Sequence, residues 1–308
     1  MPDTATAPAR LITVFNHRFD QNIPVLNAMY GERFPGLLHL VPFFEGESDS
    51  VAVVFESSHH FQGYFAQAAD RIATGEHGHY AFVGDDVALH PSLDQHSLAG
   101  ELGLGPGTAF IKELHPLSEM SYQWQHVFRG VRPFELDVGV DHASQLPAPD
   151  DAWDRASRHG YARRHLGWRN FRGFDGRVHP LQITTLIALA HLLRARGRKR
   201  LPYPLFMAYS DLFVVPAPAF PEFARICGVL AAMGVWVEVA IPTALALTCP
   251  DIATERDTRW RGVELWGSEA VSGLEKRHHR RLDELLGSFG DDQLYVHPVK
   301  LSRWETAS

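Results

Sequence analysis

The sequence predicts an α/β fold built on a mostly parallel, Rossmann-type sheet flanked by helices. Strand-like apolar segments alternate with segments of helical periodicity from residue 11 to residue 83, a pattern typical of parallel strands joined by helices. The chain has 308 residues, of which 45% are hydrophobic and 21% charged, the composition of an ordinary globular protein. No internal repeat or low-complexity linker stands out in the sequence, so we expect a single two-lobed domain.

The first third of the chain has the clearest pattern. Residues 1–10 are polar and alanine-rich, and we expect them to form a flexible N-terminus. The predicted elements that follow are a buried strand at 11–15 (LITVF), a helix at 22–30 ended by Gly31, strands at 37–44 and 51–55, an amphipathic helix at 61–72 and a strand at 80–83.

The later elements are less regular. Residues 92–180 contain Gly-rich and Pro-rich turns around short apolar pieces, and no element is assigned there. Beyond them we predict a helix at 181–196 with a basic last turn, a strand or strand pair at 205–215, a helix at 220–233, a strand or strand–helix junction at 235–240 and a short apolar piece at 293–299.

Charge and composition narrow the class of protein. A formal net charge of −7 argues against nucleic-acid binding, which normally needs a basic patch. The one basic run, residues 194–200, is interpreted as a solvated helix end, with peripheral contact to anionic lipid or contact to phosphate as the alternative. Cys227 and Cys249 lack metal-ligand spacing and are expected to be buried reduced thiols, which favours a cytoplasmic protein. Neither a secretory signal nor a transmembrane segment is predicted, because the start lacks an apolar core and no window approaches about 20 apolar residues.

Residues 81–91, AFVGDDVALHP, contain the strongest functional signal. An apolar strand delivers Asp85 and Asp86 to its end, and a proline follows at position 91. Hard cations such as Mg²⁺ and Mn²⁺ prefer carboxylate oxygens, and Mg²⁺ usually takes only one or two of them, leaving its other positions to water and substrate phosphate. The pair therefore predicts a nucleoside-diphosphate substrate held through a metal. The alternative is an ordinary turn after a strand, in which Gly and Asp are common.

Other polar residues follow the predicted strands. Ligands of open α/β sheets gather at the carboxyl ends of the strands, where Asn16, Arg18, Glu56 and Asp85 emerge. We expect Asn16, Arg18 and Glu56 to contact the base, ribose or phosphate of a nucleotide, with loop capping as the alternative.

Several segments of the chain together resemble the GT-A fold of nucleotide-sugar-dependent glycosyltransferases. The 81–91 segment is similar to the strand-terminal acidic motif, usually written DXD, of that fold, and residues 11–82 resemble its nucleotide-binding unit in order and spacing. VHPVK at 296–300 looks like the late His and Lys of several such families. The resemblance implies a nucleotide-sugar-binding lobe at 11–130 and an acceptor-binding, catalytic lobe at 131–305 of the same domain.

The resemblance also implies roles for individual residues. Asp86 would coordinate Mn²⁺ or Mg²⁺, with Asp85 as a second ligand or ribose contact and His297 completing the metal shell. Lys300 would neutralise the departing diphosphate. Many relatives have three aspartates in a row where this chain has Gly84, Asp85 and Asp86, so the acidic residue that often reaches the ribose is missing. His297 could equally be a structural histidine and Lys300 a solvated lysine.

Two acidic residues in apolar surroundings are candidates for catalysis. Glu238 interrupts GVWVEVAIPTAL, and burial of a carboxylate raises its pKa toward the range of a general base. In inverting GT-A enzymes an acid near the start of a late helix deprotonates the acceptor, and Glu238 resembles that placement. Asp211 in AYSDLFVVP would hold sugar hydroxyls or the acceptor. A partly exposed strand position for Glu238 and a turn cap for Asp211 are the alternatives.

These interpretations predict a metal-dependent glycosyltransferase of polysaccharide biosynthesis that uses a nucleotide diphosphate sugar, with a UDP-sugar as the expected donor, and a saccharide or related hydroxyl acceptor. A sugar nucleotidyltransferase is one alternative, although VFNHRFDQN lacks the expected Gly-rich loop. A noncatalytic carbohydrate-binding protein with a degenerate site is the other. The stretch 274–281, LEKRHHRR, is interpreted as the solvated face of a helix with Glu275 pairing locally.

Overall fold

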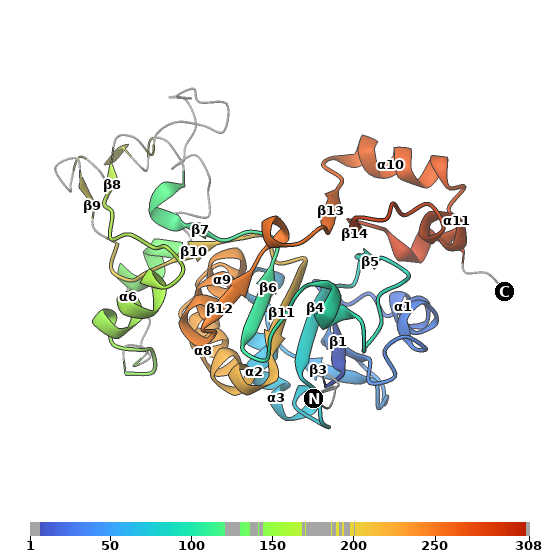
Figure 1. Ribbon diagram of the computed structural model, residues 1–308, viewed down its shortest axis with the longest axis horizontal. Helices are drawn as coiled ribbons and strands as arrows, with labels where there is room; N and C mark the ends of the chain where they lie inside the picture. Colours follow the sequence, from blue (N-terminus) through green and yellow to red (C-terminus); the bar gives the residue numbers. More distant parts are fainter. Residues whose placement is uncertain are drawn as a thin grey trace, which may run out of the picture.

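A seven-stranded sheet forms the centre of the molecule (Figure 1). The computed structural model describes residues 7–120, 130–135, 141, 144–167, 170, 186, 189–190, 193, 198–199 and 201–305. The strands of the sheet, in spatial order, are β12 (Asp251–Ala253), β6 (Thr108–Ile111), β11 (Leu212–Pro216), β4 (His79–Gly84), β1 (Ala9–Val14), β2 (Leu38–Pro42) and β3 (Val51–Val54). All neighbouring strands pair in parallel except β11, which runs antiparallel to both β4 and β6. The predicted α/β class and mostly parallel sheet are confirmed.

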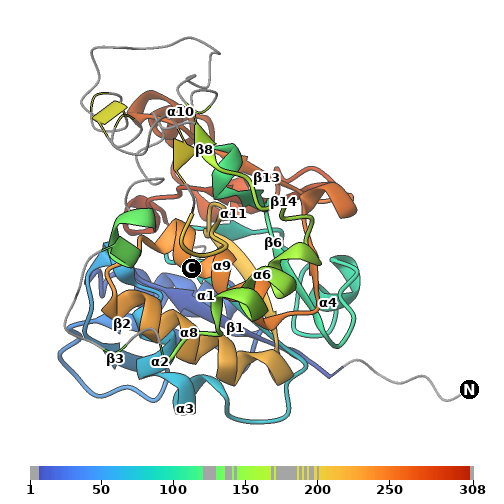
Figure 2. The ribbon, with the colours of Figure 1, turned by 90° about the vertical axis from the view of Figure 1, so that its left-hand side faces the viewer.

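Helices cover both faces of this sheet. The α-helices within the described residues are α1 (Asn22–Tyr30), α2 (Gly63–Gln67), α3 (Ala69–Ile72), α4 (Leu98–Glu101), α6 (Pro149–Ser157), α8 (Phe220–Ala232), α9 (Val237–Thr248), α10 (Ser268–Arg277) and α11 (Leu282–Leu286). Figure 2 shows α10 and α3 at opposite ends of the molecule.

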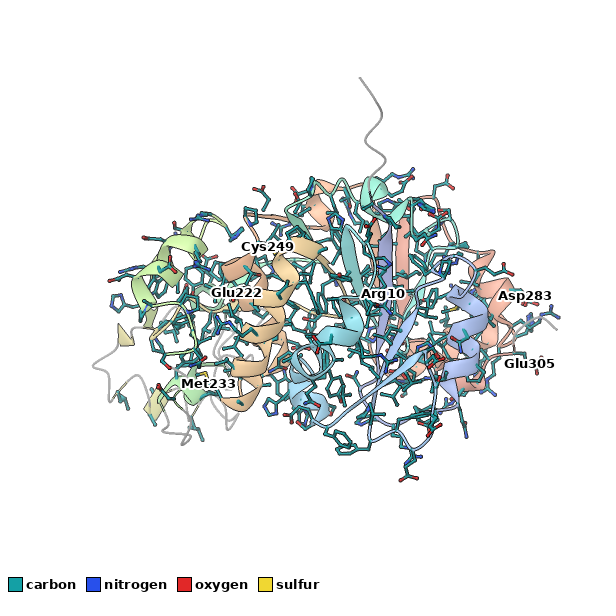
Figure 3. All side chains as sticks on the ribbon, turned by 90° about the horizontal axis from the view of Figure 1, so that it is seen from below. Arg10, Glu222, Met233, Cys249, Asp283 and Glu305 are labelled. Carbon is teal, nitrogen blue, oxygen red and sulfur yellow. The ribbon has the colours of Figure 1, made fainter. Side chains whose placement is uncertain are left out.

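The alternation of side chains along each strand creates two cores, one on each face of the sheet. In β1, Ile12 and Val14 point into a core shared with α2, α8 and α9, whereas Leu11, like Phe15 just after the strand, points into the core beneath α1. Strands buried on both faces read as continuous apolar runs, which is why LITVF was recognisable in the sequence. In Figure 3, Met233 and Cys249 lie on the α8–α9 side, and Asp283 lies at the other end.

A second, three-stranded sheet brings the C-terminal part of the chain to the edge of the central one. It consists of β13 (Arg261–Glu264), β14 (Gln293–His297) and β5 (Ala88–Leu89). β14 pairs antiparallel with β5, so that Val296 lies opposite Ala88, two residues beyond Asp86. This pairing places the residues after β14 beside the acidic turn. Two short strand pairs lie outside these sheets: β7 (His115–Pro116) with β10 (Phe206–Met207), and β8 (Leu166–Gly167) with β9 (Arg198–Lys199).

Several boundaries differ from the sequence-based prediction. β1 begins at Ala9, within the segment expected to be flexible, because the Arg10 guanidinium donates to the carbonyl groups of Gly36 and Ile72. The single helix predicted at 61–72 is two short helices, α2 and α3, because the backbone of Ala68 leaves the helical range. The strand pair predicted at 205–215 is present, but β10 and β11 belong to different sheets.

The prediction of a strand at 235–240 was wrong. Of the strand–helix junction predicted as the alternative, only the helical side is present: Trp236 is the N-cap of α9, the residues after it are helical, and the described residues between α8 and Trp236 contain no strand. The alternation of apolar and polar residues there is too short to distinguish a strand from the first turn of a helix.

Cys227 and Cys249 are free and buried, as predicted. The predicted helix at 181–196 and the basic run at 194–200 lie largely outside the described residues. Among the residues that the structure describes, no helix combines the length and apolarity needed to cross a bilayer.

Candidate active site

The acidic turn follows β4 at the carboxyl edge of the sheet. The Asp85 amide donates to the carbonyl oxygen of Val14 at 3.0 Å, which fixes the turn against the end of β1. The Asp85 carboxylate is buried, and Nδ2 of Asn22, the first residue of α1, donates to its Oδ2 at 2.8 Å. Burial raises the pKa of Asp85 to about 7, and the charge of Asp86 adds to this effect, while hydrogen bonds from Asn22 and the Asn16 backbone oppose it.

Asp86 is contacted by His297, the last residue of β14, and by residues that follow this strand. Nε2 of His297 lies 3.2 Å from Oδ1 of Asp86, and Nζ of Lys300 lies 3.3 Å from Oδ2. The Val299 amide donates to the carbonyl oxygen of Asp86 at 2.6 Å. Burial acts to raise the pKa of Asp86, but His297 and Lys300 outweigh it, and the pKa lies below its ordinary value. The carboxylate form of Asp86 is therefore favoured.

His297 joins Asp86 to a third carboxylate, Asp211. Nδ1 of His297 lies 3.4 Å from Oδ2 of Asp211, so each ring nitrogen faces an acidic oxygen. Burial acts to lower the pKa of His297, yet the contact with Asp86 and the charge of Asp211 raise it overall. Since the imidazole stands between two carboxylates, its protonated form is favoured.

The antiparallel direction of β11 explains how Asp211 reaches this site. Its amino end, not its carboxyl end, lies at the edge where β4 and β1 finish, and the Gly84 amide donates to the Asp211 carbonyl oxygen at 2.9 Å. Burial raises the pKa of Asp211 to about 6; His297 opposes this shift, while Glu264 and Asp86 add to it. Glu264 is itself paired with Lys112.

The acidic turn fits a divalent cation whose remaining ligands come from water and substrate. Oδ1 of Asp86 is buried and has no hydrogen-bond partner, although His297 is within ion-pair distance of it. Such an oxygen is a suitable ligand for Mg²⁺ or Mn²⁺. Among the described residues, no three His, Cys, Asp or Glu side chains are grouped so as to hold a metal by themselves. Asp85, Asp86 and His297 lie together, but they do not form an all-protein cage.

Two pockets open at this edge and share Asn16 and His17 in their walls. The first, here called the Lys300 pocket, has a volume of about 410 Å³, and its lining includes Asp85, Asp86 and Lys300. The second, the Glu238 pocket, has a volume of about 250 Å³ and includes Asp211 and Glu238. The ion pairs of His297 therefore connect an acid of one pocket with an acid of the other.

Glu238 lies in the first turn of α9 and is associated with an aromatic wall. Nε1 of Trp236 donates to Oε2 of Glu238 at 3.4 Å, and the Trp236 ring stacks on His59 with centroids 4.5 Å apart. All three side chains line the Glu238 pocket. The Glu238 carbonyl oxygen accepts a hydrogen bond from the Ala208 amide at 3.1 Å, which ties the start of the helix to the segment leading to Asp211.

Of the residues predicted to bind the nucleotide, Asn16 lines both pockets and Lys300 lines one. Arg18 and Glu56 are not among the residues lining either pocket. Arg18 pairs with Asp20 at 3.2 Å and Glu45 at 3.1 Å, and Glu56 accepts a hydrogen bond from the Ser57 amide at 2.7 Å. The structure therefore brings Asn16, Lys300 and the acidic residues together and leaves Arg18 and Glu56 in loop contacts.

Several residues that line the pockets were not predicted from the sequence. Asn22 was assigned only to a helix, yet it holds Asp85 in place. Trp236 and His59 stack although they are far apart in the sequence, and Arg303 reaches the Lys300 pocket from the C-terminal segment. The one available signal was position: Trp236 lies two residues before Glu238, and Arg303 three residues after Lys300.

Comparisons with known proteins place the chain in no family. No family model matches it, and no curated protein matches it. A solved structure of core-mannan synthase A from Aspergillus fumigatus, in its Mn/GDP form, is similar to 83% of this chain over 75% of its own length, with 10% identity and a TM-score of 0.32. At that TM-score the likeness supports no conclusion about the site, whose chemistry rests on its own geometry.

Proposed function

We propose that this protein is a metal-dependent glycosyltransferase that moves a sugar from a nucleotide diphosphate donor, a UDP-sugar, to a hydroxyl group of a saccharide acceptor. One observation carries the proposal: His297 links Asp86 of the Lys300 pocket to Asp211 of the Glu238 pocket, with nitrogen–oxygen distances of 3.2 and 3.4 Å. Two adjoining pockets with linked carboxylates suit a reaction between two bound substrates.

The Lys300 pocket would take the nucleotide and its diphosphate. Asp86, with Asp85, would hold Mn²⁺ or Mg²⁺, which when bound supplies Lewis-acid stabilisation of the diphosphate. Lys300 adds a positive charge at the same wall, and charge of that sign stabilises a departing diphosphate. Asn22 keeps the Asp85 carboxylate oriented through its 2.8 Å hydrogen bond.

The Glu238 pocket would take the acceptor. Carboxylates that accept hydrogen bonds from hydroxyl groups, beside the face of Trp236, suit a neutral saccharide. Glu238 would take the proton of the attacking hydroxyl if the reaction inverts the anomeric centre, as the new bond to the sugar forms and its bond to the diphosphate oxygen breaks. Asp211 would hold hydroxyl groups of the sugar or acceptor.

The proposal is tested by incubating the chain with UDP-, GDP- and CMP-sugars in Mn²⁺ or in EDTA, and following release of the nucleotide. Metal-dependent release from a nucleotide diphosphate sugar, lost in Asp86→Asn, is the expected result. Activity that needs pyrophosphate and a nucleotide instead would indicate a nucleotidyltransferase. No release from any donor, together with saccharide binding, would indicate a noncatalytic protein.

A further inference from the structure

A buried carboxylate in the C-terminal part of the chain lies next to the Lys300 pocket. Glu275 of α10 is 4% exposed and binds two arginines. Nη2 of Arg280 lies 2.8 Å from Oε2 of Glu275, and Nη1 of Arg303 lies 3.2 Å from Oε1. The expectation that 274–281 is a solvated helix face was therefore wrong for Glu275, although the predicted local pairing is present. A buried carboxylate needs such partners, because burial of an unpaired charge is costly.

The backbone near this carboxylate is strained. His279 and Arg280 have φ angles of 52° and 58°, in the left-handed region that residues with a side chain seldom adopt. This turn follows α10 and returns the chain toward Glu275, where the Arg280 amide donates to the Glu275 carbonyl oxygen at 3.0 Å. Strain of this kind persists where the surrounding contacts determine the conformation. The turn after α10 is thus tied to Glu275 by both the backbone and the side chain of Arg280.

Only one of the two arginines lines the Lys300 pocket. Arg303 ends the short 3₁₀ helix Leu301–Arg303, whose N-cap is Lys300, and its side chain is 58% exposed. A guanidinium has five N–H donors in a planar fork, so the bond from Nη1 to Glu275 leaves donors for a ligand. Because Glu275 carries one negative charge and pairs with both Arg280 and Arg303, this group has one positive charge in excess. The charge of Lys300, by contrast, is balanced by Asp86.

We propose that Arg303, held in place by Glu275, binds a phosphate group in the Lys300 pocket and does so without a divalent cation. The ligand class is the diphosphate of the nucleotide donor, so the assignment of the natural ligand rests on the function proposed above. Arg303 is the binding residue, and Glu275 is a positioning residue. The fork of a fixed arginine matches two phosphate oxygens, and fixing it beforehand reduces the entropy lost on binding.

The test uses inorganic pyrophosphate as the probe, because it needs no choice of base or sugar. Isothermal titration of the full chain in EDTA and low salt compares the wild type with Arg303→Gln, Arg303→Lys and Arg280→Gln. Arg303→Gln should weaken binding by about 10–100-fold, since it removes charge-assisted hydrogen bonds. Arg303→Lys should lie between that variant and the wild type. Arg280→Gln is the matched control, because it also removes a cation from Glu275 but none from the pocket. It should weaken pyrophosphate binding at most about threefold.

Glu275→Gln tests the positioning role. It should weaken pyrophosphate binding several-fold although Arg303 is present, and Arg303→Gln in the same background should then have a smaller effect than in the wild type. Thermal unfolding of each variant checks that it is folded. If Glu275→Gln does not fold, Arg303→Gln still tests the inference, because Arg303 is exposed and its replacement should not disturb the fold.

The outcomes separate this inference from the proposed function. If the wild type binds no pyrophosphate in EDTA, if Arg303→Gln binds as tightly as the wild type, or if Arg280→Gln is equally impaired, Arg303 is not the phosphate ligand. If pyrophosphate binding requires Arg303 while no nucleotide sugar is ever turned over, the anion site stands and the glycosyltransferase proposal falls.

Discussion

The backbone amide of Val299 donates to the carbonyl oxygen of Asp86 at 2.6 Å, across 213 positions of the sequence. This bond places His297 and Lys300 on either side of the Asp86 carboxylate, at 3.2 and 3.3 Å. The antiparallel pairing of β14 with β5 sets the register, because β5 begins two residues after Asp86. The geometry of the candidate site therefore depends on a small sheet that joins distant parts of the chain.

We expect Asp86→Asn to remove metal-dependent transfer, with a fall in kcat of about 100–1000-fold or more, because the amide cannot supply the charge of the carboxylate. The fold should persist, since His297 retains its contact with Asp211. Mn²⁺ titration by electron paramagnetic resonance and steady-state turnover measure the two effects. Unchanged turnover would remove Asp86 from the scheme.

Glu238→Gln should lower kcat by about 100–10,000-fold while the KM for the donor stays nearly constant, because the loss concerns proton transfer from the acceptor. The Trp236 indole can donate to the amide oxygen of Gln as it does to the carboxylate, so the local structure should be kept. Glu222→Gln, at an exposed ion pair of α8, is the control and should leave kcat unchanged. An equal loss in both variants would argue against a base at position 238.

The buried side chain of His39 should make stability pH-dependent. Its ring bonds to Thr13 at 2.6 Å and to Asn27 at 3.0 Å, and burial lowers its pKa to about 4. Between pH 6.5 and 4 the His39 ring takes up a proton more readily in the unfolded chain than in the folded one. The contribution of neutral His39 to the free energy of unfolding is therefore complete above about pH 6.5 and is lost as the pH falls toward 4. Its size is about 3 kcal/mol. Urea unfolding at several pH values measures the free energy of unfolding of the wild type and of His39→Gln. The difference between the two should fall as the pH is lowered from 6.5 to 4, and a difference that does not change with pH would contradict the prediction.

Gly262→Ala should destabilise the small sheet. A Cβ atom at position 262 would lie 2.2 Å from the Tyr295 ring, so strand β13 or Tyr295 must move, at a cost of about 1–3 kcal/mol. Since Tyr295 donates to Glu264 at 3.4 Å near Asp211, activity should fall as well. Gly100→Ala in α4, where no atom lies within 4 Å, should be neutral or stabilising. Chemical denaturation compares the two; equal stability would show that the Tyr295 ring can move freely.

Patterns of local sequence were enough to predict five strands of the main sheet (β1, β2, β3, β4 and β11) and the place of the acidic turn, but not β6 or β12. Apolar runs such as LITVF are recognisable because a strand buried on both faces has no polar side. The boundaries at Ala9 and Ala68 were not predicted, since the first depends on Arg10 binding distant carbonyl groups and the second on a local backbone change without a proline or glycine.

The sequence by itself determined which residues could carry out the chemistry: two adjacent carboxylates after a strand, Glu238 in apolar surroundings, and a late His–Pro–Val–Lys segment. Only the tertiary structure decided which of these meet. It joined Asp86 to Asp211 through His297, buried Glu275 against Arg280 and Arg303, and left Arg18 paired with Glu45. The reason is physical: ion pairs act over a few ångströms, whereas the order of strands that brings side chains within that distance is set by packing of both sheets.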